Sequence, residues 1–174
     1  MKEHFNASTF ILGGARSGKS RRAQTLAEEI SAQRIFIATA EPFDEEMLER
    51  ITRHRSDRGP DWQTVEAPLE LSEAISRWAS ADTVCLVDCL TLWLSNLMHA
   101  DRDVARETDA VKQSIRNAAG PVVLVSNEVG FGLVPETPLG RRFRDAQGRV
   151  NQEIAAACDR VEFIAAGLSI TLKG

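Results

Sequence analysis

Residues that could hold a nucleoside triphosphate stand near the start of the chain. The run Gly13-Gly14-Ala15-Arg16-Ser17-Gly18-Lys19-Ser20 has G-x-x-x-x-G-K-S spacing and follows a short apolar stretch. The backbone N–H groups of such a loop point at a phosphate, and the helix that follows adds its positive N-terminal end. Lys19 would reach the β- and γ-phosphates, and Ser20 would bind Mg²⁺. An ordinary glycine-rich turn is the alternative, although the spacing and the lysine favour a phosphate-binding loop.

A carboxylate ends a second apolar stretch. Asp88 directly follows the apolar residues 84–87, which is a Walker B pattern. Ligands of open α/β sheets collect at the carboxyl ends of the strands, so Asp88 could bind Mg²⁺ there, directly or through water. An aspartate that caps the next helix is the alternative. A phosphate-binding loop in the same chain favours the metal-binding interpretation.

Two further polar residues follow the strand expected at residues 122–126. Asn127 and Glu128 could orient a nucleophile or a metal-bound water, and the glycines after them suit a mobile loop over a substrate. A capped turn explains them equally simply. Arginines on the helix expected after this loop could pair with phosphates, although surface helices are often rich in arginine. They are Arg141, Arg142, Arg144 and Arg149.

His54 is the histidine whose surroundings suggest chemistry. On a helix, Met47, Ile51 and His54 fall at intervals of four and three residues, so the imidazole shares an apolar stripe, and Arg53 and Arg55 flank it. A packed histidine near a helix end, with cations that suit the helix dipole, explains this pattern. The functional alternative is a nucleophile, or an acid/base, among cations that hold phosphates.

The elements that must position these residues alternate along the chain. Strands are expected at residues 9–12, 35–38, 83–87, 122–126 and 161–165, and helices at residues 19–31, 44–55, 69–80, 90–98, 103–119 and 139–158. Asp44 and Ser72 are capping candidates. The alternation predicts a mainly parallel sheet flanked by helices, to which residues 63–66 and 168–172 could add antiparallel edge strands. Because no repeat or linker divides residues 1–174, one domain is expected.

Composition limits the classes of protein that fit. The 174 residues include 43% hydrophobic residues and carry a net charge of −4, so nothing in the balance draws the chain to nucleic acid or to an anionic membrane. The chain shows neither a signal peptide nor a membrane-spanning run, which predicts a cytoplasmic location and small-molecule partners. Cys85, Cys89 and Cys158 form no C-x-x-C pair, and neither a disulfide nor a metal site is expected from them.

Several of these segments together resemble one family. They are residues 13–20, residues 37–40 (Ile-Ala-Thr-Ala), residues 44–59 with His54, and residues 127–130 (Asn-Glu-Val-Gly), continued by residues 142–145 and 148–152. The chain is similar to the bifunctional adenosylcobinamide kinase/adenosylcobinamide-phosphate guanylyltransferases of cobalamin biosynthesis, from about residue 9 to the carboxyl terminus. The resemblance implies a RecA-like P-loop sheet with added antiparallel strands, assembled as a homotrimer.

The resemblance also implies two reactions. ATP or GTP phosphorylates adenosylcobinamide, and GTP then gives GMP to a histidine and onward to adenosylcobinamide phosphate. By motif that histidine is His54, while Mg²⁺ and Lys19 neutralise the departing pyrophosphate. Some relatives have two adjacent histidines where this chain has Arg53-His54, and the Walker B carboxylate, often glutamate, is Asp88 here. Nucleotide contacts are expected from Ala38, Thr39, Ala40, Arg55, Ser56, Asp57, Arg58, Glu66 and Asp88.

Two other functions explain part of the pattern. A monofunctional small-molecule kinase or nucleoside triphosphatase would use everything except His54. A regulatory module that binds GTP or ATP without turnover would need only the phosphate-binding loop. A covalent guanylyl intermediate distinguishes the bifunctional enzyme from both.

Overall fold

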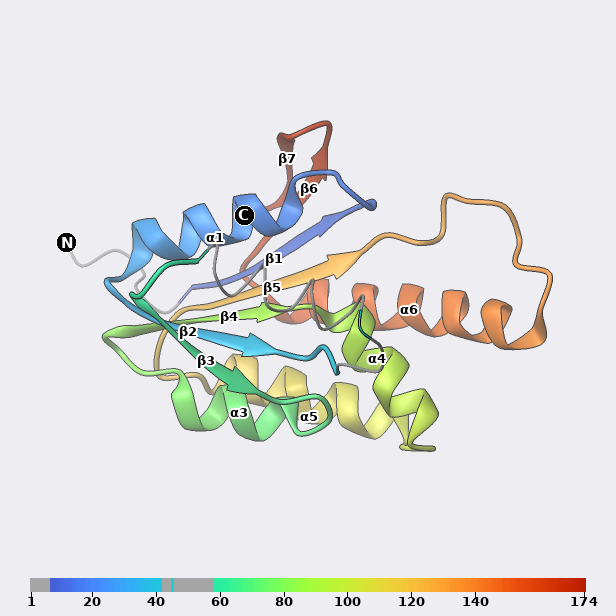
Figure 1. Ribbon diagram of the computed structural model, residues 1–174, viewed down its shortest axis with the longest axis horizontal. Helices are drawn as coiled ribbons and strands as arrows, with labels where there is room; N and C mark the ends of the chain where they lie inside the picture. The colour runs from blue at the N-terminus through green and yellow to red at the C-terminus, as the bar shows by residue number, and fades with distance from the viewer. Residues whose placement is uncertain (1–6, 42–44, 46–57) are drawn as a thin grey trace.

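The computed structural model describes residues 7–41, 45 and 58–174. These residues form a seven-stranded sheet in the order β3-β2-β4-β5-β1-β6-β7 (Figure 1). Every neighbouring pair is parallel except β6 with β7. The strands are β1 (Ser8–Gly13), β2 (Gln33–Ala38), β3 (Trp62–Glu66), β4 (Thr83–Asp88), β5 (Val122–Asn127), β6 (Arg160–Ala165) and β7 (Leu168–Lys173).

Helices cover both faces of the sheet, which is why its central strands are continuous apolar runs. On one face, Ala23 and Ala27 of α1 (Lys19–Ile30) pack into a core with side chains of β2, β4, β5, β1 and β6. Four further helices of the described residues lie on the opposite side (Figure 1). They are α3 (Leu71–Trp78), α4 (Leu90–His99), α5 (Val104–Arg116) and α6 (Pro138–Ala157). The carboxyl ends of the parallel strands therefore meet at one edge, where α1 and α4 begin.

The two expected edge strands differ in direction. Residues 168–172 lie in β7, which pairs antiparallel with β6, as predicted. The prediction for residues 63–66 was wrong: β3 runs parallel to β2, with Ile35 opposite Gln63 and Ala38 opposite Glu66. A parallel neighbour needs a crossover of a dozen or more residues, and residues 39–61 are long enough to make one. Four residues of strand-like pattern carry no information on direction.

Helix starts follow local capping chemistry in two of the helices. Asp103 caps α5 by accepting a hydrogen bond from the Arg106 N–H, and Thr137 caps α6 in the same way from Gly140. The expectation for Ser72 was wrong, because Glu70 is the N-cap residue of α3 and Ser72 lies inside the helix. Asp44 and most of the helix expected at residues 44–55 lie outside the described residues.

The three cysteines behave as small apolar residues. All three thiols are free and buried. Burial raises the pKa of Cys85 and Cys158 to about 12 and that of Cys89 to about 11. Separately, none of the helices in the described part of the chain has the length and apolar character needed to cross a membrane.

Candidate functional site

The phosphate-binding loop connects the end of β1 to the start of α1. Gly18 is the N-cap residue of α1 with a φ of 97°, a left-handed conformation that glycine adopts without strain, and no side chain caps the helix. A Cβ on Gly13 would lie 2.5 Å from Ser17 Oγ and 2.7 Å from the Ile164 carbonyl oxygen. Both glycines are therefore required by the backbone path. The uncapped N–H groups of α1 are the kind that bind a phosphate.

Neighbouring elements hold this loop from two sides. Lys19 is only 9% exposed, and its Nζ donates a 3.0 Å hydrogen bond to the Gly14 carbonyl. The Gly167 N–H, from the β6–β7 turn, donates to the Ser17 carbonyl at 2.8 Å, and the Glu128 N–H donates to the Gly13 carbonyl at 3.1 Å. Ser17 Oγ is buried and has no hydrogen-bond partner among the described residues. The loop thus has a fixed path and carries one buried hydroxyl whose hydrogen-bonding capacity is unused among the described residues.

Asp88 ends β4 on the same face of the sheet as α1. Val84 and Leu86, which precede it at intervals of two, belong to the core cluster that packs on α1. The N-cap residue of α4 is Cys89, with no side-chain cap, so Asp88 is not the cap of this helix. The peptide bond between Asp88 and Cys89 is cis.

The donor set of this edge fits Mg²⁺ better than a transition metal. Ser20 and Asp88 offer a hydroxyl and a carboxylate oxygen. The described residues contain no group of three histidine, cysteine, aspartate or glutamate side chains that could hold a metal by themselves. Mg²⁺ commonly binds through one or two protein oxygens together with substrate phosphates, and these two oxygens suit that arrangement.

Asn127 and Glu128 differ in how they are held. Asn127 lies opposite Gly13 in the parallel pairing of β5 with β1. Its backbone N–H and its Nδ2 both donate to Thr91 Oγ1 of α4, at 2.9 and 3.2 Å. The Glu128 carboxylate instead accepts a 2.6 Å hydrogen bond from the Gly130 N–H of its own turn. Packed elements therefore fix Asn127, whereas the Glu128 side chain bonds within its own turn.

Thr39, expected to contact a nucleotide, uses its side chain inside the protein. It is fully buried after β2, and its Oγ1 donates to the Cys89 carbonyl at 2.7 Å and accepts from the Cys89 N–H at 2.9 Å. Asn96 of α4 donates to the Thr39 carbonyl at 2.8 Å. The Thr39 hydroxyl thus ties the end of β2 to the start of α4. Ala38 and Ala40 on either side of it are half-buried.

Arg58 and Glu66 lie near the outer strands of the sheet. The Arg58 guanidinium stacks 3.4 Å from the centre of the Phe36 ring on β2, and exposed Glu66 ends β3. At a spacing of about 4.8 Å per strand, β2 and β3 are roughly 14 and 19 Å from β1. His54, Arg55, Ser56 and Asp57 lie outside the described residues.

The predicted site residues at the strand ends that the structure describes therefore form two groups along one edge of the sheet. The phosphate-loop group consists of residues 13–20 with Asp88, Asn127 and Glu128. The outer-strand group consists of Ala38, Thr39, Ala40, Arg58 and Glu66. β4, which carries Asp88, lies between β2 and β5 and so adjoins both groups.

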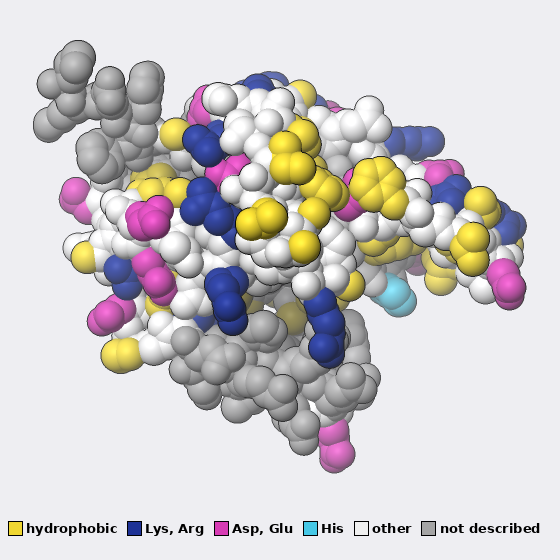
Figure 2. All heavy atoms as spheres, turned by 90° about the horizontal axis from the view of Figure 1, so that it is seen from above, with side chains coloured by type: hydrophobic (Ala, Val, Ile, Leu, Met, Phe, Trp, Pro, Cys, Tyr) yellow, Lys and Arg dark blue, Asp and Glu magenta, His cyan; other side chains and the backbone are white. Residues whose placement is uncertain are grey.

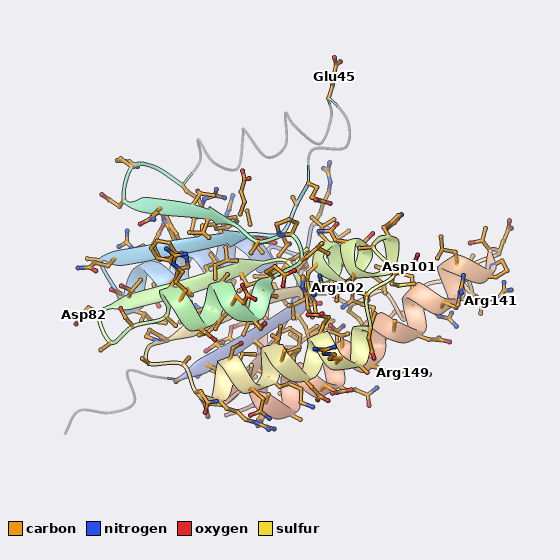
Figure 3. All side chains as sticks on the ribbon, turned by 90° about the horizontal axis from the view of Figure 1, so that it is seen from below. Glu45, Asp82, Asp101, Arg102, Arg141 and Arg149 are labelled. Atoms are coloured by element: carbon orange, nitrogen blue, oxygen red, sulfur yellow. The ribbon has the colours of Figure 1, made fainter. Side chains whose placement is uncertain are left out.

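The arginines of α6 are distributed along the helix. Figure 3 shows Arg141 near its outer end and Arg149 farther along. Arg141 Nη1 donates to the carbonyls of Pro135 and Glu136 at 3.0 and 2.7 Å, which ties the loop before α6 to the helix. Arg144 lies 3.8 Å from Asp145. These contacts give Arg141 a structural role in the described residues.

Sequence reasoning missed four polar residues that lie behind Asn127. They are Thr91, Ser126, Gln147 and Asn151. One signal was present: Gln147 and Asn151 share a buried stripe of α6 with Val150 and Ile154. Amides on an otherwise apolar stripe indicate a buried polar contact, but the sequence does not name the partner.

Comparison with solved structures shows that other proteins share this fold. The flagellar accessory protein FlaH from Methanocaldococcus jannaschii is similar with a TM-score of 0.55 at 12% identity, over 97% of this chain and 79% of that one. A prototypical ATPase from the type III secretion system of pathogenic bacteria is similar with a TM-score of 0.56 at 11% identity, over 96% of this chain and 57% of that one. At such identities the likeness concerns the fold alone. The predicted fold class, a mainly parallel P-loop sheet with an antiparallel edge, is confirmed.

Sequence comparison then places the chain in a family. The family described as cobinamide kinase / cobinamide phosphate guanyltransferase matches residues 9–172. The bifunctional adenosylcobalamin biosynthesis protein CobP of Pseudomonas aeruginosa is 46% identical over 94% of this chain and 96% of its own length. The bifunctional adenosylcobalamin biosynthesis protein CobU of Escherichia coli is 38% identical over 94% of this chain and 98% of its own length. The chain belongs to this family.

Proposed function

We propose that this protein phosphorylates adenosylcobinamide with ATP or GTP and then transfers GMP from GTP to adenosylcobinamide phosphate, giving adenosylcobinamide-GDP. The observation that carries the proposal is a fully formed phosphate-binding loop in a chain whose family match spans residues 9–172. A kinase without the second reaction would need the loop alone. The match includes residues 44–59 with His54, which favours two reactions.

In the kinase step, the loop N–H groups and Lys19 bind the nucleotide phosphates. The Lys19 ammonium exchanges its hydrogen bond to the Gly14 carbonyl for phosphate oxygens, which carry more charge. Ser20 and Asp88 would hold Mg²⁺, which supplies charge neutralisation on the phosphates when it is bound. The hydroxyl of the cobinamide aminopropanol arm attacks the terminal phosphorus, the bond to the bridging oxygen breaks, and the hydroxyl proton is released.

In the second step His54 is the nucleophile. A neutral imidazole nitrogen attacks the α-phosphorus of GTP, so a P–N bond forms and pyrophosphate leaves. A phosphate oxygen of adenosylcobinamide phosphate then attacks the same phosphorus, the P–N bond breaks, and a diphosphate forms. Arg55, Ser56, Asp57, Arg58 and Glu66 are proposed nucleotide contacts in this step, together with Ala38, Thr39 and Ala40.

A homotrimer is part of the proposal. Apolar side chains reach the surface on the face that carries the β6–β7 hairpin (Figure 2). On the edge strand β7, Leu168, Ile170 and Leu172 are 73, 57 and 60% exposed, and an exposed apolar patch at a sheet edge suits a contact with another copy. Light scattering at assay concentration should give three times the mass of the chain, and a fully active monomer would contradict the trimer. We place the enzyme in the cytoplasm, where its nucleotide substrates are found.

The decisive experiment is an intact-mass measurement after incubation with GTP and Mg²⁺. We expect one GMP per chain on His54, stable in alkali and labile in acid, because protonation of the ring makes imidazole a good leaving group. His54→Ala should lose both the adduct and adenosylcobinamide-GDP formation while phosphorylation of adenosylcobinamide continues. His99→Ala, at an exposed histidine of α4, is the matched control and should keep both reactions. Normal adenosylcobinamide-GDP formation by His54→Ala would refute the proposal.

A further inference from the structure

Four buried or half-buried polar side chains lie directly behind Asn127, and we call them the amide cluster. They are Thr91 of α4, Ser126 of β5, and Gln147 and Asn151 of α6. Ser126 and Gln147 are fully buried, and Asn151 is 6% exposed. Their neighbours on the same elements, such as Leu124 and Ile154, are apolar core residues. The amide cluster is therefore a polar insertion in a hydrophobic core.

Hydrogen bonds connect the members of the amide cluster across three elements. Ser126 Oγ donates to Asn151 Oδ1 at 2.7 Å. Gln147 Nε2 donates to the same Asn151 oxygen at 2.9 Å and to Ser126 Oγ at 3.0 Å. Thr91 Oγ1 lies 3.5 Å from Ser126 Oγ, which continues the chain of contacts to α4.

Members of the amide cluster on α4 and on α6 both form hydrogen bonds with Asn127. Thr91 Oγ1 accepts hydrogen bonds from the backbone N–H and the Nδ2 of Asn127. From α6, Asn151 Nδ2 donates to the Asn127 carbonyl at 3.2 Å. The backbone and the side chain of Asn127 are thus both constrained by side chains from other elements.

Asn127 lies directly beside the phosphate-binding loop. It lies opposite Gly13, the first residue of the phosphate-binding loop, and β5 separates the loop strand β1 from β4 with Asp88. Val123 and Val125, which precede it at intervals of two, belong to the core on the α1 side. Alternation along the strand puts Asn127 in register with this side, and its Nδ2 bonds to Thr91 near the start of α4, so the side chain lies at the carboxyl edge of the sheet between α1 and α4.

Packing alone would favour apolar side chains at the buried positions of the amide cluster. Gln147 Oε1 is buried without a hydrogen-bond partner among the described residues, and such an atom reduces stability. An apolar side chain at this position would avoid that loss. Sequences that keep a locally unfavourable residue commonly do so at a functional site.

We infer that the amide cluster positions Asn127 for the kinase step, in which the Asn127 amide orients the acceptor hydroxyl against the terminal phosphoryl group. The inference rests on the proposed kinase reaction. A neutral amide takes up no proton, so its contribution is orientation, which depends on a fixed position. Gln147, Asn151 and Thr91 act through Asn127 and are positioning residues.

Gln147→Leu separates positioning from stability. Leucine keeps the volume and removes the unpartnered oxygen together with the two hydrogen bonds that Gln147 Nε2 donates, while Ser126 still donates to Asn151. We expect nearly unchanged thermal stability, because removing the unpartnered oxygen offsets the two lost hydrogen bonds, with roughly a tenfold lower kcat for adenosylcobinamide phosphorylation and little change in KM for ATP. Thr108→Val is the matched control, because it removes a buried hydroxyl of α5 that donates to Val104. It should keep kcat. A normal kcat in Gln147→Leu would overturn the inference.

A double-mutant cycle tests whether Asn151 acts through Asn127. We expect Asn127→Ala to lower kcat about a hundredfold and Asn151→Ala roughly tenfold. In the Asn127→Ala background, adding Asn151→Ala should change kcat less than about twofold. Equal losses in both backgrounds would mean that Asn151 acts independently, which would also overturn the inference. Failure of the wild-type protein to phosphorylate adenosylcobinamide refutes the proposed kinase instead, and the inference falls with it.

Discussion

The phosphate-loop group and the outer-strand group lie at the same edge of one sheet but are built differently. Backbone hydrogen bonds from Gly167 and Glu128 hold the loop, and the amide cluster holds Asn127 beside it. In the outer-strand group, the Thr39 hydroxyl bonds to Cys89 and Glu66 is exposed. The expected nucleophile, His54, lies outside the described residues. A short motif thus sets the path of the loop, which distant residues hold in place, whereas the outer-strand group has no such motif at its centre.

Lys19→Ala should have the largest effect, because it removes the cation that would bind phosphate charge in both reactions. We expect a loss of about 10²- to 10³-fold in kcat/KM for phosphorylation of adenosylcobinamide, with the fold retained. Lys112→Ala is the control, since its ammonium pairs with Asp109 and Glu153 on the opposite side of the sheet. Measuring the GMP adduct in the same variant tests whether the outer-strand group depends on the loop to bind GTP. A normal adduct would mean that the outer-strand group binds GTP without the loop.

Glu162→Gln should loosen the support of the loop helix. Glu162 is fully buried on β6 and accepts hydrogen bonds from Arg22 of α1 at 2.8 and 2.9 Å and from Arg160 at 2.9 Å. Losing the charge should cost about 2 kcal/mol, less than in a fully buried pair because both arginines are partly exposed. Urea unfolding at pH 7 measures this loss. An unchanged midpoint would mean that the ion pair does not hold α1.

The same carboxylate predicts a pH dependence. Chiefly through the hydrogen bond from Arg22, the pKa of Glu162 lies below its ordinary value of 4.5. Its stabilisation is therefore fully present above about pH 4.5 and decreases as the pH falls through the lowered pKa of the folded state. The difference in unfolding free energy between wild type and Glu162→Gln should shrink in acid. A difference that stays constant down to pH 3 would contradict this.

Asp88→Asn tests the member of the phosphate-loop group that lies nearest to the outer strands. The amide keeps the side-chain volume but loses the charge that Mg²⁺ favours, so half-maximal kinase activity should need roughly tenfold more Mg²⁺. Asp109→Asn, at an exposed aspartate of α5, is the control and should leave the Mg²⁺ titration unchanged. If the titration of Asp88→Asn equals that of wild type, Asp88 does not bind the metal.

Thr39→Val should have the smallest effect. It tests whether Thr39, in the outer-strand group, only stabilises the fold or also contacts the nucleotide. Losing the two hydrogen bonds to Cys89 should lower the free energy of unfolding by about 1 kcal/mol. Thr83→Val, whose hydroxyl makes only a 3.4 Å contact with Gln33, is the control and should change stability less. KM for GTP should be unchanged in both variants. A higher KM in Thr39→Val alone would make Thr39 a nucleotide contact, as the sequence predicted.

Short-range patterns in the sequence determined the phosphate-binding loop, the five central strands and the end of β4 at Asp88. Each depends on neighbours within a few residues: glycine conformations and the lysine in the loop, and continuous apolar runs in strands covered on both faces. The predicted fold class followed from the alternation of these runs with helical stretches, and it is confirmed.

Only the tertiary structure decided which distant residues meet. The parallel direction of β3 depends on the path of its crossover, and the bond from Arg22 to Glu162 joins residues 140 positions apart. The amide cluster forms because strand order places β5 between β1 and β4 while α6 packs behind it. Amides and carboxylates have the same local preferences whether they face solvent or a partner, so their pairing follows from packing and not from sequence spacing.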